Sequence, residues 1–170
     1  LQESAASLAR TSANIFDEAM GRPLFPLYRV IERGGVKVGL VSVLDPALAL
    51  RAVQGPVEGV RVEDPRPALE AVLPELDARC DLVVLLAHME SNDLRDLVQD
   101  LEADGPGVDV AVLSHGTRKA YQPRRVGTTW ILAANGRGKV LGQARIFLDG
   151  KGGVARVENT LHEISLDLPR

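Results

Sequence analysis

Residues 80–115 read CDLVVLLAHMESNDLRDLVQDLEADGPGVDVAVLSH, and this stretch decides the fold class. Residues 80–87 (CDLVVLLA) are expected to form a buried strand, because the run from Leu82 to Ala87 is apolar. Residues 91–103 are expected to form an amphipathic helix, with Ser91 as a candidate cap and apolar side chains at helical spacing at Leu94, Leu97, Val98 and Leu101. Residues 108–113 (VDVAVL) are expected to form a second short buried strand. Strand, helix and strand in this order predict a parallel βαβ unit, and therefore an α/β fold.

The sequence before this unit predicts a β-hairpin. Residues 27–32 alternate as a strand, and residues 36–44 return as a largely apolar strand. Gly34-Gly35 between them suits a tight turn, because glycine adopts positive φ without strain. A short strand is also expected at 12–16, and the Pro- and Gly-punctuated residues 45–65 are expected to be irregular.

One more helix and three more strands are predicted, besides the end of a helix at residues 1–10. The helix is expected from Pro67 to Arg79, with Asp64 as a cap and with a kink or break at Pro74, which has no N–H to donate. Strands are expected at 125–134, 140–148 and 154–166, and a tight turn at 150–153 joins the last two. Residues 1–170 are therefore expected to form one domain.

Composition argues against several classes of protein. The chain is 45% hydrophobic and 25% charged, which is enough apolar material for a core. The net charge is −3 and no basic stripe is present, so no nucleic-acid polymer is expected as a partner. No apolar run approaches the ~20 residues that span a membrane. Cys80 is the single cysteine, so neither an internal disulfide nor a cysteine-pair zinc knuckle is expected.

The start of the chain is unusual. The first residue is Leu1, and residues 1–8 lack the charged region, apolar core and cleavage site of a signal peptide. We therefore expect residue 1 to lie inside a longer polypeptide. The N-terminal part of that same polypeptide is then an expected partner of this chain.

Two histidines follow the two strands of the βαβ unit. His88 ends the run LVVLLAH, and His115 ends the run VDVAVLSH. Because the carboxyl ends of parallel strands share one edge of a sheet, both imidazoles are expected there, where ligands gather in such folds. Imidazole is a good ligand for zinc, manganese or iron, but two histidines make an incomplete site. A histidine after an apolar strand is also a common loop or core residue, so the spacing alone leaves metal binding open.

The order of motifs along the chain resembles a known family. SAN at 12–14, GGVKVGLVSV at 34–43, LLAH at 85–88, VDVAVLSHG at 108–116 and WILAANGRGKVLGQARIFLD at 130–149 occur at similar spacings in calcineurin-like metallophosphoesterases, in the branch of the periplasmic 5′-nucleotidases. The resemblance covers the latter half of the catalytic domain, over roughly residues 12–150. It implies a partial αββα sandwich with mixed sheets, a βαβ unit and a β-rich C-terminal segment.

The resemblance also implies a dinuclear site for divalent metals such as manganese, zinc or iron. His88 and His115 match two histidine ligands of the family. The family's next ligand falls on Thr117, a poor ligand for a transition metal, and the glycine before the second histidine is Ser114 here. Both departures put the standard second metal position in doubt. The remaining ligands and the catalytic groups precede this region in the family, so the chain alone is expected to be inactive.

The resemblance extends to the substrate and the compartment. The family hydrolyses phosphate esters with a metal-activated water, so a phosphorylated small molecule such as a nucleotide is the implied substrate. Asn135 and Gly136 match a family loop near the site and are candidate substrate-binding residues, although a purely structural turn is an equal alternative. A periplasmic or otherwise exported location is implied by the resemblance alone.

Two other readings stay open. The replacement at Thr117 also fits a degenerate relative that serves as a non-catalytic binding or scaffold domain. A plain α/β domain without a metal, which shares the fold and not the chemistry, is the third possibility.

Overall fold

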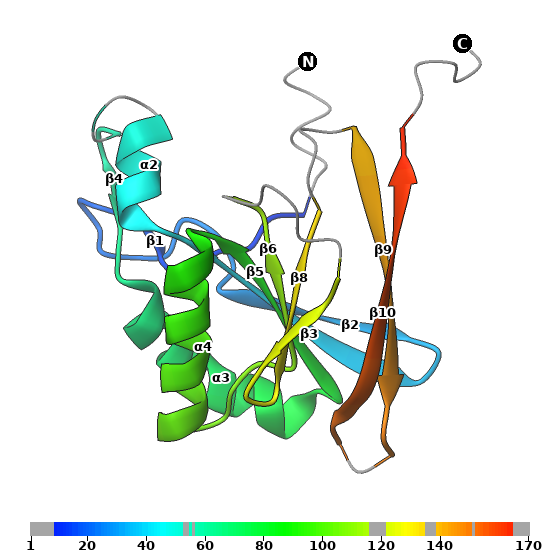
Figure 1. Cartoon of the computed structure of the whole chain (residues 1–170). Coiled ribbons are helices and arrows are strands. Elements are labelled where there is room, and N and C mark those ends of the chain that lie inside the picture. Colours follow the sequence, from blue (N-terminus) through cyan, green and yellow to red (C-terminus); the bar gives the residue numbers. More distant parts are fainter. Residues whose placement is uncertain are drawn as a thin grey trace.

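A computed structural model describes residues 9–52, 55, 57–115, 122–134, 139–150 and 152–164. Its centre is a six-stranded sheet in the order β2–β3–β5–β6–β8–β7 (Figure 1). The four inner strands, β3 (Val36–Leu44), β5 (Leu82–His88), β6 (Val110–Leu113) and β8 (Thr129–Ala133), are parallel. The edge strands β2 (Tyr28–Arg33) and β7 (Arg124–Val126) are antiparallel to their neighbours. The α/β class predicted from the sequence is confirmed.

The βαβ unit forms as predicted, with β5, helix α4 (Ser91–Asp104) and β6 in sequence. The predicted cap was one residue off, because Ser91 is the first helical residue and Glu90 occupies the N-cap position. The Glu90 side chain makes no hydrogen bond to the first turn of the helix. Its carboxylate is therefore free to face other groups.

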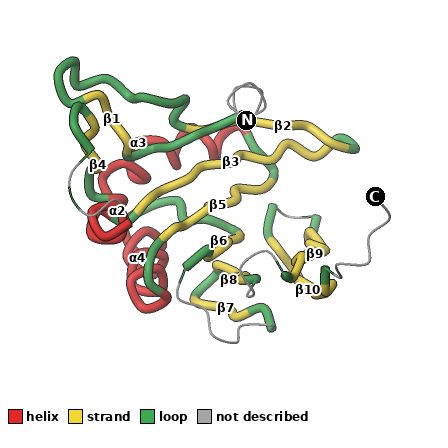
Figure 2. Tube along the Cα trace, turned by 90° about the horizontal axis from the view of Figure 1, so that it is seen from above, coloured by secondary structure: helices red, strands yellow, loops and turns green. Residues whose placement is uncertain are grey.

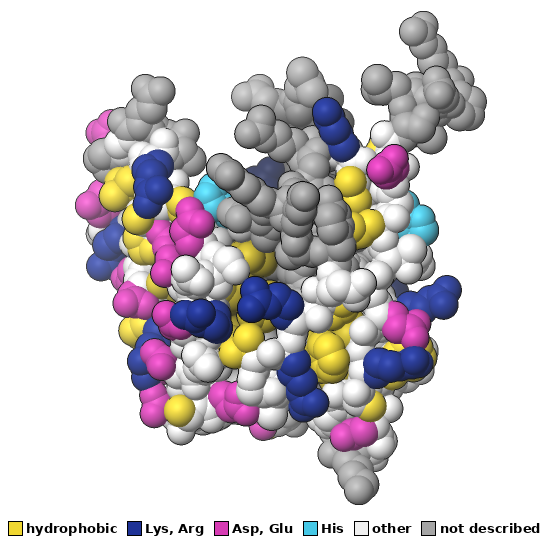
Figure 3. All heavy atoms as spheres, in the orientation of Figure 1, with side chains coloured by type: hydrophobic (Ala, Val, Ile, Leu, Met, Phe, Trp, Pro, Cys, Tyr) yellow, Lys and Arg dark blue, Asp and Glu magenta, His cyan; other side chains and the backbone are white. Residues whose placement is uncertain are grey.

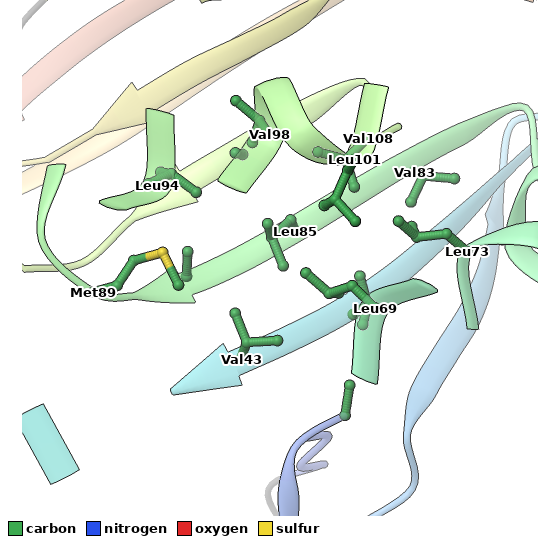
Figure 4. Packing of buried hydrophobic residues seen from close by; sticks show 14 of the residues in the cluster. Val43, Leu69, Leu73, Val83, Leu85, Met89, Leu94, Val98, Leu101 and Val108 are labelled. Atoms are coloured by element: carbon green, nitrogen blue, oxygen red, sulfur yellow. The ribbon is translucent and has the colours of Figure 1, made fainter. Parts of the chain in front are cut away.

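Helices α3 (Pro65–Arg79) and α4 cover one face of the sheet (Figure 2). Figure 4 shows their apolar side chains pointing onto the strands, where Leu69, Leu85 and Leu94 have no exposed surface. The α3 and α4 stripes (Leu69, Val72, Leu73 and Leu76; Leu94, Val98 and Leu101) supply the helical half of this core. Truncating such a leucine to alanine costs about 2–5 kcal/mol.

Helix α3 differs from the prediction at its interior proline. The helix begins at Pro65, two residues earlier than expected, and Asp64 caps it by accepting a hydrogen bond from the N–H of Arg66 at 2.8 Å. It continues through Pro74 without a break. Pro74 lies on the exposed side of the helix, opposite the buried leucines. The buried residues Leu73 and Leu76, before and after Pro74, hold the helix against the core.

A two-stranded hairpin, β9 (Val140–Leu148) and β10 (Val154–Glu163), lies on the other face of the sheet, away from the helices (Figures 1 and 2). Val157 of β10 is buried against Leu82, Val110 and Leu132, and Trp130 packs against the same cluster. Leu82 and Val110 begin their strands and Trp130 is the second residue of β8, whereas Leu132 lies near the carboxyl end of β8. Further along β5 on this face, Leu86 is 42% exposed. The hairpin therefore covers only part of the face.

The stretch 45–65 was predicted to be irregular, and this prediction was wrong. It contains helix α2 (Pro46–Ala52) and strand β4 (Val60–Val62), which pairs with β1 (Ile15–Asp17). Asn14, just before β1, has no exposed surface and joins these segments. Its amide nitrogen donates to the carbonyls of Leu44 at 2.7 Å and Glu63 at 2.8 Å.

The predicted strand at 125–134 is in fact a hairpin. Strands β7 and β8 pair antiparallel, with Val126 opposite Thr129. The turn needs positive φ at its first residue, and Gly127 supplies a φ of 55°. A Gly-Thr pair between β-branched residues is a weak turn signal, which is why the run was interpreted as one strand.

Charged side chains of both signs are mixed over the face drawn in Figure 3. This distribution agrees with the small net charge of −3. Among the described helices, none is long and apolar enough to cross a membrane.

Candidate functional site

Two of the chain's three histidines meet at the carboxyl edge of the sheet. His88 is the last residue of β5, and His115 follows the end of β6 by two residues. Because β5 and β6 are parallel neighbours, both leave the sheet at the same edge. The two imidazole centroids are 5.1 Å apart, and the ring planes meet at 64°. The proximity expected from the sequence is thus present, whereas a role in metal binding stays a prediction.

Ser114 connects the two strand ends. Its hydroxyl oxygen lies 2.9 Å from Nδ1 of His88, and the hydroxyl donates to the carbonyl of Ala87 at 3.3 Å. The backbone N–H of Ser114 donates to the same carbonyl at 3.0 Å. Sequence reasoning noted Ser114 only as a replacement for glycine. The contact with His88 depends on the register of β5 and β6, which no local motif encodes.

Glu90 lies beside the second histidine. Its Oε1 is 3.4 Å from Nε2 of His115, and the two side chains are 46% and 40% exposed. Asp93 is the acidic residue in the first turn of α4, where a negative charge complements the helix dipole. Glu90 differs from Asp93 because its carboxylate also contacts an imidazole.

The described residues do not complete a metal site. No group of three or more histidine, cysteine or acidic side chains among them is arranged to hold an ion. Thr117, Asn135 and Gly136 lie outside the described residues, so their predicted roles stay predictions. The third histidine, His162, is exposed on β10, where its Nε2 lies 2.9 Å from Oε1 of Gln143.

A groove beside the histidines runs along the part of the sheet face that the β9–β10 hairpin leaves open. It has a volume of about 490 Å³. Apolar side chains including Phe25, Leu44, Leu86 and Val112 line it, together with His88 and Ser114. Inner parallel strands normally have both faces covered. An apolar groove on such strands is the kind of surface that another layer of protein buries.

Comparison with known proteins gives a consistent set of relatives, although no family model matches the chain. A 5′-nucleotidase of Vibrio cholerae is 28% identical over 90 residues, which are 52% of this chain and 16% of that protein. The chain therefore spans about a sixth of this curated relative.

Solved structures match over almost the whole chain. The sulfate thiohydrolase SoxB of Thermus thermophilus, solved with glycerol, superposes with a TM-score of 0.76 at 29% identity, over 90% of this chain and 28% of that one. The calcineurin-like phosphoesterase YfkN of Bacillus subtilis superposes with a TM-score of 0.72 at 18% identity, over 96% of this chain and 58% of that one. The mixed sheet and its helices match the C-terminal parts of such phosphoesterase domains.

Proposed function

The chain is similar in sequence and fold to the C-terminal part of 5′-nucleotidase-type metallophosphoesterase domains, and from this premise we propose that it is part of a metal-dependent phosphoester hydrolase. In this proposal, His88 and His115 are ligands of one divalent metal ion, such as manganese, zinc or iron. The observation that carries the proposal is the pair of imidazoles, 5.1 Å apart, at the shared edge of β5 and β6.

The spacing of the rings fits a shared metal. When two imidazoles bind one ion at metal–nitrogen distances of about 2.1 Å, their ring centroids lie about 4.5–5.2 Å apart. The range corresponds to nitrogen–metal–nitrogen angles from the octahedral to the tetrahedral value. The observed 5.1 Å falls in this range. Imidazole nitrogen also suits these metals chemically. The two histidines therefore fit the ion that the resemblance implies.

The chain supplies positioning and two of the donor groups. A divalent metal bound here would polarise a phosphoryl oxygen and lower the pKa of a bound water. Rigid placement comes from the parallel pairing of β5 with β3 and β6, which fixes both strand ends against the buried core. The substrate that we propose is a phosphorylated small molecule such as a nucleotide, and Asn135 and Gly136 are the residues that we propose to bind it.

We further propose that an N-terminal part of the same polypeptide completes the site. It would cover the groove around Leu86, which is 42% exposed on an inner parallel strand, and would add the remaining ligands and the catalytic groups. The parent polypeptide, meaning the longer chain that contains residues 1–170, is then active, and residues 1–170 alone are inactive. An exported location follows only from the resemblance and stays a prediction.

The test compares three histidine variants of the parent polypeptide. We expect His88→Ala and His115→Ala each to lower bound metal and the hydrolysis rate of a generic aryl phosphate. His162→Ala is the matched control, because this exposed histidine lies on the hairpin and contacts Gln143. If metal content and rate are unchanged in the first two variants, the assignment is wrong. If the wild-type parent binds metal but turns over no aryl phosphate with added manganese, the non-catalytic scaffold is favoured instead.

A second reaction class is favoured by one observation. A sulfate thiohydrolase matches the chain at 29% identity, which is level with the 28% identity of the Vibrio cholerae 5′-nucleotidase. Hydrolysis at a sulfur-centred ester is therefore the second candidate. Assays of the parent polypeptide with nucleotides and with an S-sulfonated thiol distinguish the two.

A further inference from the structure

We propose that Ser114 and Glu90 are positioning residues that hold one nitrogen of each imidazole and so leave Nε2 of His88 and Nδ1 of His115 as the metal-binding atoms. This inference rests on the proposed metal role of the two histidines. It concerns contacts of this chain that lie beyond the histidines themselves. A metal-ligating histidine commonly has its other nitrogen held in this way, which fixes the tautomer and the ring orientation.

The hydroxyl of Ser114 determines the tautomer of His88. A hydroxyl has one proton to donate, and that of Ser114 donates to the carbonyl of Ala87. With the hydroxyl proton directed at Ala87, its oxygen accepts from Nδ1 of His88, which lies 2.9 Å away. In this arrangement Nδ1 carries the proton. The unprotonated nitrogen with a free lone pair is Nε2.

The carboxylate of Glu90 favours the opposite tautomer at His115. Its Oε1 lies 3.4 Å from Nε2 of His115, and because an ionised carboxylate only accepts hydrogen bonds, this contact favours the proton on Nε2. The lone pair is then on Nδ1. Both side chains are partly exposed, so this contact orients the ring more than it stabilises the fold.

Neither the Ser114 hydroxyl nor the Glu90 carboxylate is needed for the local structure. The backbone N–H of Ser114 already bonds to Ala87, so the hydroxyl is not needed to join β5 and β6. Glu90 makes no side-chain cap to α4, so its removal leaves the helix start unchanged apart from the dipole. Asp93 shares that dipole role, because it lies in the first turn of α4 and is exposed.

The first test reads the tautomers in the metal-free parent polypeptide. Long-range ¹H–¹⁵N spectra of labelled histidine are expected to show Nδ1–H for His88 and Nε2–H for His115. Ser114→Ala should mix the tautomers of His88 only, and Ser114→Thr, which keeps the hydroxyl, should restore the single form. Glu90→Ala should mix those of His115 only. The reverse tautomers in the wild type would overturn the proposal.

The second test measures zinc affinity by competition with a chromophoric chelator. Ser114→Ala and Glu90→Ala are each expected to weaken binding about 10- to 100-fold. Asp93→Asn, with the same loss of charge on the same helical turn, and Ser91→Ala, with the same loss of a hydroxyl, should leave it unchanged. If His88→Ala and His115→Ala lose zinc while Ser114→Ala and Glu90→Ala do not, the positioning roles are refuted and the metal site stands. If the histidine variants also keep zinc, the proposed function fails.

Discussion

Asn14 is the polar residue whose loss should most disturb the scaffold beneath the site. Besides donating to two carbonyls, its Oδ1 accepts from the N–H of Leu44 at 3.1 Å. Leu44 is paired with His88 across β3 and β5. Asn14 therefore ties the β1–β4 ribbon to the strand that neighbours the candidate site.

We predict that Asn14→Ala lowers the free energy of unfolding by about 3 kcal/mol. Three backbone groups, the N–H and carbonyl of Leu44 and the carbonyl of Glu63, lose their partner, and each unsatisfied group costs about 1 kcal/mol or more. Asn14→Asp keeps the shape but places a carboxylate against two carbonyl oxygens, so we expect a larger loss.

The assay is denaturant unfolding of the parent polypeptide, with hydrogen exchange of the peptides around Leu44 and Glu63 as a local readout. Asn92→Ala is the control, because Asn92 is exposed in the first turn of α4. A loss below about 1 kcal/mol for Asn14→Ala, with unchanged exchange at both peptides, would refute this reasoning.

Three more perturbations test separate parts of the structure. Burial raises the pKa of Asp109, so this residue contributes stability that is present below its unfolded pKa of about 3.9 and is lost as pH rises through the higher folded pKa. Over that pH range, the melting temperature of Asp109→Asn should rise relative to that of the wild type. A difference in melting temperature that does not change with pH would contradict this. If a further layer of protein covers the groove, Leu86→Asp should destabilise the parent polypeptide by about 2 kcal/mol or more. Leu141→Asp is the control and should be tolerated, because Leu141 on β9 is 60% exposed. Equal melting temperatures of the two variants would show that no layer covers Leu86. Arg66 bridges α3 and α4 through exposed carboxylates. Arg66→Ala should therefore lower the free energy of unfolding, measured by chemical denaturation, by at most about 1 kcal/mol, and by less at high salt. A decrease above about 2 kcal/mol would contradict this surface role.

The elements with strong periodicity were predictable from the sequence. The hairpin around Gly34-Gly35, the βαβ unit and both long helices follow from local pattern, since each buries one apolar stripe or run. The errors fell where tertiary contacts decide the outcome. Strand β4 depends on pairing with β1 and on the hydrogen bond from Asn14 to Glu63, and α3 continues through Pro74 because its buried face outweighs one lost hydrogen bond.

The candidate site was predictable only in part. The positions of His88 and His115 follow from parallel topology, which brings the ends of neighbouring strands to one edge. The contacts of Ser114 and Glu90 with the rings depend on strand register and side-chain direction, so the sequence alone did not reveal them. The uncovered face around Leu86 likewise became visible only in three dimensions.

Anomalous X-ray diffraction at the zinc edge, from crystals of the parent polypeptide grown with Zn²⁺, would locate the metal relative to both rings. We predict a peak about 2.0–2.1 Å from Nε2 of His88 and from Nδ1 of His115. Zinc bound elsewhere in such a crystal, with both rings free of it, would contradict the assignment of these two imidazoles as ligands.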